Sequence, residues 1–189
     1  MMKRLALLIG FFLFSAGIAY AKLHGSDISG STIGQRWEAV NAEAQPIEAS
    51  AMQGKLRLYF FGFTQCPDVC PTTLLRLSEM YSLLDEREQA QLSIVLVSVD
   101  PERDTPEVIK RYLANFSERF EGLTGTPAQI QRLAQSFKVF YRKVPLGDTY
   151  TMEHSANLFL FDKKGNAKLF YYGDIAPENL ASDIKTLLR

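Results

Sequence analysis

The apolar run at residues 56–63 is the feature that most constrains the fold of this chain. Its nearly continuous hydrophobic character is typical of a β-strand that is covered on both faces, and residues 92–99 have the same character. Two such strands need helices on both sides of their sheet. The chain is therefore restricted to layered α/β architectures.

The segments around these strands alternate between helix and strand signals. Thr105 is a good N-cap residue, and Pro106 follows it at the first helical position. The predicted helices cover residues 71–84, 106–116, 127–137 and 177–188. The other predicted strands form a hairpin region at 37–52 with a turn at 53–55, a short strand at 120–124, and a hairpin at 156–162 and 167–172 turned at 163–166. This order predicts an α/β three-layer sandwich with a mixed central sheet, which fits a thioredoxin-like fold.

The N-terminal segment has the pattern of a secretory signal. Lys3 and Arg4 precede an apolar run at residues 5–20, and Ala19 and Ala21 form a small-residue cleavage pattern. The run would be about 24 Å long as a helix, which is short for a hydrocarbon core of about 30 Å, so a retained membrane anchor is the second interpretation. A mitochondrial presequence should be amphipathic and rich in arginine, and this segment is neither. We expect export to the bacterial periplasm, in soluble form or tethered to the inner membrane.

A single folded domain is predicted after this segment. Residues 1–21 are assigned to a signal peptide or short membrane anchor, residues 22–34 to a flexible polar tether, and residues 35–189 to a thioredoxin-like domain. The 21 basic and 21 acidic residues give a formal net charge of +0, which argues against nucleic-acid binding. The 2 cysteines are too few for a disulfide-rich scaffold.

Both cysteines follow the first buried strand, at the edge of the sheet where open α/β folds bind ligands. Pro71 fits best at the first position of the next helix, which predicts Cys70 as the N-cap and places Cys66 in the preceding loop. Both sulfurs then lie near the positive end of a helix dipole, which lowers the pKa of a thiol. A structural disulfide would close a small loop and stabilise the fold little. The pair is therefore more consistent with metal binding or thiol exchange.

His154 is the single histidine of the predicted domain. It lies just before the strand predicted at 156–162, on a loop that faces the cysteine loop in thioredoxin-like topology. Two thiolates and one imidazole form a coherent ligand set, in which sulfur suits Cu(I) and the imidazole keeps Cu(II) accessible. The alternative is a surface or capping histidine, which would be the better interpretation of an arbitrary lone histidine.

Four segments of the chain closely resemble the Sco/SenC family, in the same order. They are Phe-Gly-Phe-Thr-Gln-Cys-Pro-Asp-Val-Cys-Pro at 61–71, Val-Asp-Pro-Glu-Arg-Asp-Thr-Pro-Glu at 99–107, Gly-Leu-Thr-Gly-Thr-Pro at 122–127, and Glu-His-Ser at 153–155. The resemblance extends from about Gly34 to the C-terminus. The order and the specificity of these motifs identify the chain as similar to that family over its whole predicted domain.

The family resemblance implies a function. Its members are thioredoxin-fold copper proteins, exported or anchored in a membrane, that help to assemble the dinuclear copper centre in subunit II of cytochrome c oxidase. By that similarity Cys66, Cys70 and His154 would bind copper, as Cu(I) and Cu(II), and cytochrome c oxidase subunit II would be the partner, with other periplasmic copper carriers as further candidates. Copper delivery and reduction of the disulfide in the receiving subunit both stay open. Gln65 departs from the pattern, because many members have histidine there, but this removes no expected ligand.

Other interpretations remain beside this one. A metal-free thiol-disulfide oxidoreductase or peroxidase is the first, although redox thioredoxins usually have two residues between their cysteines and a proline near residues 151–161, and this chain has neither. Zinc with water as a fourth ligand is the second. His24 would be third in the chain after cleavage, and we hypothesise a square-planar Cu(II) site there. Residues 100–104 are expected to shape a loop and cap a helix.

Overall fold

An eight-stranded mixed sheet forms the centre of the protein in the computed structural model, which describes residues 22–189. Its strands, from one edge to the other, are β1 (Ser26–Asp27), β10 (Ala167–Tyr171), β9 (Leu158–Phe161), β4 (Leu56–Gly62), β5 (Leu92–Ser98), β6 (Glu121–Thr124), β2 (Glu38–Asn41) and β3 (Pro46–Glu48). β4 and β6 both pair parallel with β5, whereas β9 pairs antiparallel with β4. The predicted signal or anchor lies outside the described residues.

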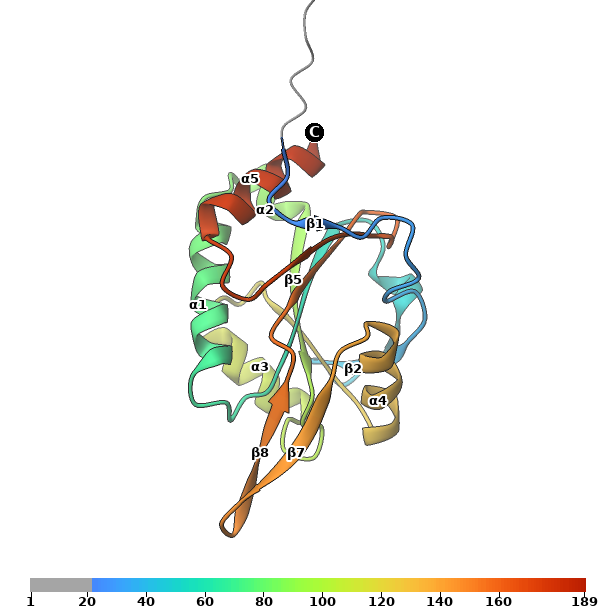
Figure 1. The fold of residues 1–189 in the computed structure, drawn as a ribbon, viewed down its shortest axis with the longest axis vertical. Helices are drawn as coiled ribbons and strands as arrows, with labels where there is room; N and C mark the ends of the chain where they lie inside the picture. Colours follow the sequence, from blue (N-terminus) through green and yellow to red (C-terminus); the bar gives the residue numbers. More distant parts are fainter. Residues whose placement is uncertain (1–21) are drawn as a thin grey trace, which may run out of the picture.

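Helices cover both faces of this sheet (Figure 1). They are α1 (Val69–Ser82), α2 (Glu86–Ala90), α3 (Pro106–Ala114), α4 (Pro127–Ser136) and α5 (Pro177–Leu188), with a 3-10 turn η1 (Ala49–Met52). α1, α3 and α5 lie on one side and α4 on the other (Figure 1), and α1 packs against α5. The predicted three-layer α/β architecture is therefore confirmed. Within residues 22–189, no helix is both long and apolar enough to cross a membrane.

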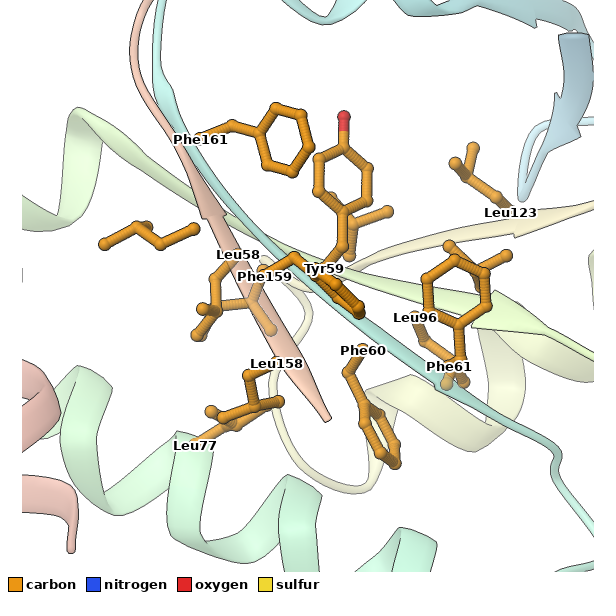
Figure 2. Close-up of a cluster of buried hydrophobic side chains, with 14 of the residues drawn as sticks. Leu58, Tyr59, Phe60, Phe61, Leu77, Leu96, Leu123, Leu158, Phe159 and Phe161 are labelled. Carbon is orange, nitrogen blue, oxygen red and sulfur yellow. The ribbon is translucent and has the colours of Figure 1, made fainter. Parts of the chain in front are cut away.

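The core explains why β4 lies at the centre. All of its residues are buried, and successive side chains point to opposite faces of the sheet. Leu58 lies on the face of α1 with Leu77 (Figure 2). The rings of Tyr59 and Phe61 pack on Phe137, with ring centroids 5.1 and 5.0 Å apart. Burying each large apolar side chain contributes about 1.5–3 kcal/mol. The sequence run that predicted this strand thus fills both halves of the core.

Helix starts follow capping chemistry, with one correction. The Thr105 side chain accepts a hydrogen bond from the backbone N–H of Val108, as predicted for an N-cap. α1, however, begins at Val69 with Asp68 at the N-cap position, so the prediction of Cys70 as the N-cap is wrong. Pro71 is tolerated in the first turn because its missing N–H would have no intrahelical partner there. Cys70 consequently lies within α1, and the helical backbone fixes the direction of its side chain.

A long hairpin between α4 and β9 was not predicted. Its strands β7 (Tyr141–Leu146) and β8 (Thr149–His154) pair with each other, and they project from one end of the molecule (Figure 1). Most of their side chains are exposed or half-buried, and Pro145 lies within β7. Proline weakens a strand signal, and an exposed ribbon lacks the apolar alternation that marks a half-buried strand.

Residues 22–34, which were expected to be a tether, lie against the domain. β1 pairs antiparallel with β10. The carboxylate of Asp183 in α5 is buried, and it accepts hydrogen bonds from the backbone N–H groups of His24 and Gly25. The N–H of Gly34 donates to the carbonyl oxygen of Ser136, 2.9 Å away. The chain enters the domain at the end opposite the β7–β8 hairpin (Figure 1).

Candidate metal centre

Three side chains from separate elements meet at one edge of the sheet. Cys66 lies in the loop after β4, Cys70 in the first turn of α1, and His154 at the end of β8. One ligand atom from each of them lies within 4.8 Å of the others. The fold therefore brings together the three residues that the sequence singled out as candidate ligands.

The two thiols have unequal environments. Both are free, but Cys66 is half-buried whereas Cys70 is fully buried. A hydrogen bond from the Cys70 side chain is the main factor that lowers the pKa of Cys66 to about 3, and hydrogen bonds from backbone amides add to it. The same hydrogen bond and burial raise the pKa of Cys70 well above the ordinary range of a thiol. The pair thus shares one proton, with Cys66 as the thiolate and Cys70 as the thiol.

His154 presents its Nε2 atom to this pair. The distance from Nε2 to the Cys70 Sγ is 3.5 Å, and Nδ1 lies 3.2 Å from the carbonyl oxygen of Ser155. A carbonyl oxygen only accepts, so Nδ1 carries the proton and the lone pair of the neutral ring is on Nε2. The ring also packs edge-on against Phe63, with centroids 5.8 Å apart. A backbone partner that fixes the tautomer in this way is typical of ligating histidines.

Asp104 anchors the start of the cysteine loop. Its buried carboxylate accepts hydrogen bonds from the backbone N–H and hydroxyl of Thr64, at 3.0 and 2.6 Å, and from the hydroxyl of Ser98, at 2.6 Å. Its carbonyl oxygen accepts from the hydroxyl of Thr124. Burial is the main factor that raises the pKa of this carboxyl group. Asp104 therefore ties the loop that carries Cys66 to the ends of β5 and β6, beyond the loop-shaping role expected for residues 100–104.

Two glycines allow the elements of the site to approach each other. A Cβ atom on Gly62 would lie 3.0 Å from the Cys70 Sγ, and one on Gly173 would lie 2.3 Å from the carbonyl oxygen of Ala156. The Arg76 side chain donates to the Gly173 carbonyl, 3.3 Å away. A surface hollow of about 390 Å³ adjoins this side of the site, lined by Asp68, Val69, Thr72, Thr73, Arg76, Ala156, Gly173 and Asp174. The hollow thus borders the segment between the two cysteines, at Asp68 and Val69.

The hypothesised Cu(II) site at His24 conflicts with the structure. A square-planar site there needs the deprotonated amide and the imidazole of this residue. The amide N–H and Nδ1 of His24 instead contact the buried Asp183 carboxylate, both at 2.9 Å. In the folded chain, these two atoms bind the N-terminal segment to α5 and not a metal ion.

The fold and the site together define a class of protein, a thioredoxin-like domain with two thiols and one imidazole converging at the carboxyl edge of its sheet. The sequence model of one family, described as SCO1/SenC, matches residues 25–189. The chain belongs to the SCO1/SenC family.

Relatives of known sequence and structure agree with this assignment. A SCO2-like protein of Rickettsia felis is 35% identical over 156 residues, which cover 81% of this chain and 76% of the relative. The copper-bound structure of Bradyrhizobium japonicum ScoI is 37% identical with a TM-score of 0.76, and it covers 82% of this chain and 99% of that chain. The solution structure of apo Sco1 from Thermus thermophilus is 36% identical with a TM-score of 0.79, and it covers 89% and 99%.

Proposed function

We propose that this protein binds copper through Cys66, Cys70 and His154 and serves the assembly of cytochrome c oxidase. The observation that carries the proposal is the convergence of the three ligand atoms within 4.8 Å. Support comes from the copper-bound ScoI structures of Bradyrhizobium japonicum and Arabidopsis thaliana, which are 37% and 30% identical to this chain. A further relative, BsSco, is described as a member of the Sco family of cytochrome c oxidase assembly proteins.

The residues at the site fit copper as a cargo. Thiolates are soft ligands that favour Cu(I), and an imidazole is suited to both oxidation states. Cys66 already exists as a thiolate, and the Nε2 atom of His154 is unprotonated in the neutral ring. Only the Cys70 proton must leave when the metal enters, so uptake releases one proton to solvent.

The unequal exposure of the ligands makes the site accessible from one side. Cys66 is half-exposed, whereas Cys70 is fully buried and belongs to the core. A ligand of a partner protein can therefore reach the metal-binding atoms from the Cys66 side. We infer that cargo enters and leaves by exchange of ligands on this side, with Cys70 as the last protein ligand released.

Reduction of a partner disulfide is a second candidate function, favoured by the free and unequal thiols. The Cys66 thiolate would attack one sulfur of the partner disulfide and release the partner's other sulfur as a thiolate. Cys70, after losing its proton, would then attack Cys66 in this mixed disulfide and release the second partner sulfur. As a Cys66–Cys70 disulfide forms, the partner gains two electrons, one proton from the Cys70 thiol and a second proton from solvent. BsSco, 25% identical, is a relative in which a disulfide switch has been identified.

Cytochrome c oxidase subunit II is the proposed partner, with other periplasmic copper carriers as sources of the metal. The proposed location is the periplasm, with residues 5–20 acting as the export signal or as an anchor in the inner membrane. Because the described chain begins at the end opposite the β7–β8 hairpin (Figure 1), an anchor there leaves the hairpin end free for partners.

One transfer experiment separates these functions. The copper-loaded, reduced protein is mixed with the apo, disulfide-bonded copper-centre domain of subunit II, and metal and thiol contents of both proteins are measured after separation. Metal arriving without thiol change supports delivery, and thiols exchanging without metal support reduction. The same experiment is repeated with His154→Ala, which removes the proposed nitrogen ligand. His24→Ala is the matched control, because it removes a histidine far from the site. If neither metal nor thiols move, or if zinc but not copper binds, the proposed function is wrong.

A further inference from the structure

We propose that Arg103 is a positioning residue that clamps the His154-bearing hairpin onto the cysteine loop and thereby sets the affinity of the site for oxidised copper. This inference rests on the proposed function, because it concerns how the same site is held together. Arg103 lies in the loop between β5 and α3, outside the three ligands.

One nitrogen of Arg103 joins the two halves of the site. Its Nη1 atom donates to the side-chain oxygen of Gln65 and to the carbonyl oxygen of Tyr150, both at 3.0 Å. Gln65 directly precedes Cys66, and Tyr150 lies on the strand that ends at His154. The distance between the imidazole and the sulfurs thus depends in part on this bridge.

Asp100 holds the guanidinium in place. Its buried carboxylate forms an ion pair with the Arg103 Nε atom and accepts a hydrogen bond from the Tyr150 hydroxyl at 2.9 Å. The Arg103 guanidinium also stacks on the Tyr150 ring, 3.8 Å from its centroid. The Arg103 side chain is only 17% exposed, so water screens these interactions less than those of a surface pair. Arg103, Asp100 and Tyr150 therefore form one connected unit, which we call the hairpin clamp.

The hairpin needs such a clamp because side chains fix its position. Within residues 22–189, β7 and β8 pair only with each other and with no strand of the main sheet. Beyond the hairpin clamp, Met152 of β8 packs into the main core, and an exposed ion pair, of a kind that contributes little in water, joins Lys143 to Glu102. Loss of the Arg103 bridge should thus free the hairpin to move while the core stays folded.

The chemistry of the cargo predicts which binding step suffers. Two thiolates retain Cu(I) when the imidazole moves away, whereas Cu(II) depends more strongly on a nitrogen ligand. A loosened hairpin therefore weakens Cu(II) binding selectively. Lysine at position 103 keeps the charge but not the planar fork of donors, so it should not restore the bridge.

The test uses Arg103→Gln and Arg103→Lys, with Arg111→Gln as the control. Arg111→Gln removes the same positive charge, but from an exposed ion pair with Glu107 on α3. Amide hydrogen exchange of β8 in the metal-free protein should become about tenfold faster in both Arg103 variants, the effect expected for loss of a charge-assisted hydrogen bond, and stay unchanged in Arg111→Gln. Unchanged exchange in the Arg103 variants would overturn the clamp, and this result does not depend on whether copper binds.

A double-mutant cycle then tests the link to His154. Arg103→Gln should weaken Cu(II) binding about tenfold and leave Cu(I) binding within about twofold, and the same change made in a His154→Ala background should have no further effect on Cu(II). Retained Cu(I) binding shows that the variants are folded. An equal Cu(II) loss with and without His154 would contradict a positioning role. Absence of copper binding by the unaltered protein would instead refute the proposed function.

Discussion

The two halves of the metal centre are held in place by different means. The cysteine half sits on β4 and α1, where buried apolar packing and the Asp104 carboxylate fix the backbone. The imidazole half is carried by a hairpin that has no backbone pairing with the main sheet within residues 22–189. The sulfur pair is therefore rigidly held, and the imidazole is a proposed ligand whose position is set by side-chain contacts. This difference suits a site that must hold a metal and also release it.

The largest predicted effect comes from removing sulfur from the rigid half. Cys66→Ser and Cys70→Ser should each weaken Cu(I) binding by more than about 100-fold, because outer partners of a metal ligand alone contribute 10–100-fold. Competition with a chromophoric Cu(I) chelator measures this. Equal Cu(I) affinity in the unaltered protein and both variants would refute the assignment of these ligands.

The next largest predicted effect is a difference between the alkylation rates of the two thiols. Since the pKa of Cys66 is lowered to about 3 and that of Cys70 is raised, only Cys66 is a thiolate in mildly acidic solution. Iodoacetamide at about pH 5 should therefore alkylate Cys66 and spare Cys70, with a rate that stays flat up to about pH 8. Mass spectrometry of the digested protein identifies the modified residue. A rate that rises with pH toward the ordinary thiol pKa would show that Cys66 is not activated.

Asp104→Ala tests how firmly the cysteine half is held, because it removes the carboxylate that anchors the cysteine loop. It leaves the Thr64 N–H, the Thr64 hydroxyl and the Ser98 hydroxyl without their acceptor, so the free energy of unfolding should fall by about 3 kcal/mol. Urea unfolding measures this change. Tyr150→Phe, which removes one hydrogen bond of the hairpin clamp, is the matched comparison and should cost about 1 kcal/mol or less. Equal losses would mean that the two halves are equally integrated into the fold.

His154→Ala should produce the smallest change in the free energy of unfolding. Cu(II) affinity should fall about tenfold or more, Cu(I) affinity should fall less, and the urea midpoint should stay close to that of the unaltered protein, because the ring lies on the hairpin and outside the main core. Isothermal titration with both oxidation states tests this. A large loss of global stability would show that the His154 ring itself supports the core.

Much of the fold was predictable because its elements carry strong local signals. The run at residues 56–63 identifies β4, and the Thr105-Pro106 pair gives the start of α3. The last helix was predicted with its observed bounds, Pro177–Leu188. The hairpin was missed because its side chains are exposed and Pro145 interrupts β7.

The candidate site was predictable only as a set of residue types. The motif around Cys66 and Cys70 and the single histidine of the domain pointed to the ligands. The start of α1 at Val69 was missed because proline fits several positions of a first helical turn. The contacts of Asp104 with Thr64 and of Arg103 with Tyr150 join residues 40 and 47 positions apart. No local pattern encodes such pairs, so only the folded chain reveals them.

X-ray absorption at the copper edge, on the protein loaded with one equivalent of Cu(I), shows whether Cys66, Cys70 and His154 bind the metal together. We expect two sulfur ligands and one nitrogen ligand per copper ion, with the nitrogen lost in His154→Ala and one sulfur lost in Cys66→Ser. A spectrum without sulfur ligands, or one that none of these substitutions alters, would contradict this expectation.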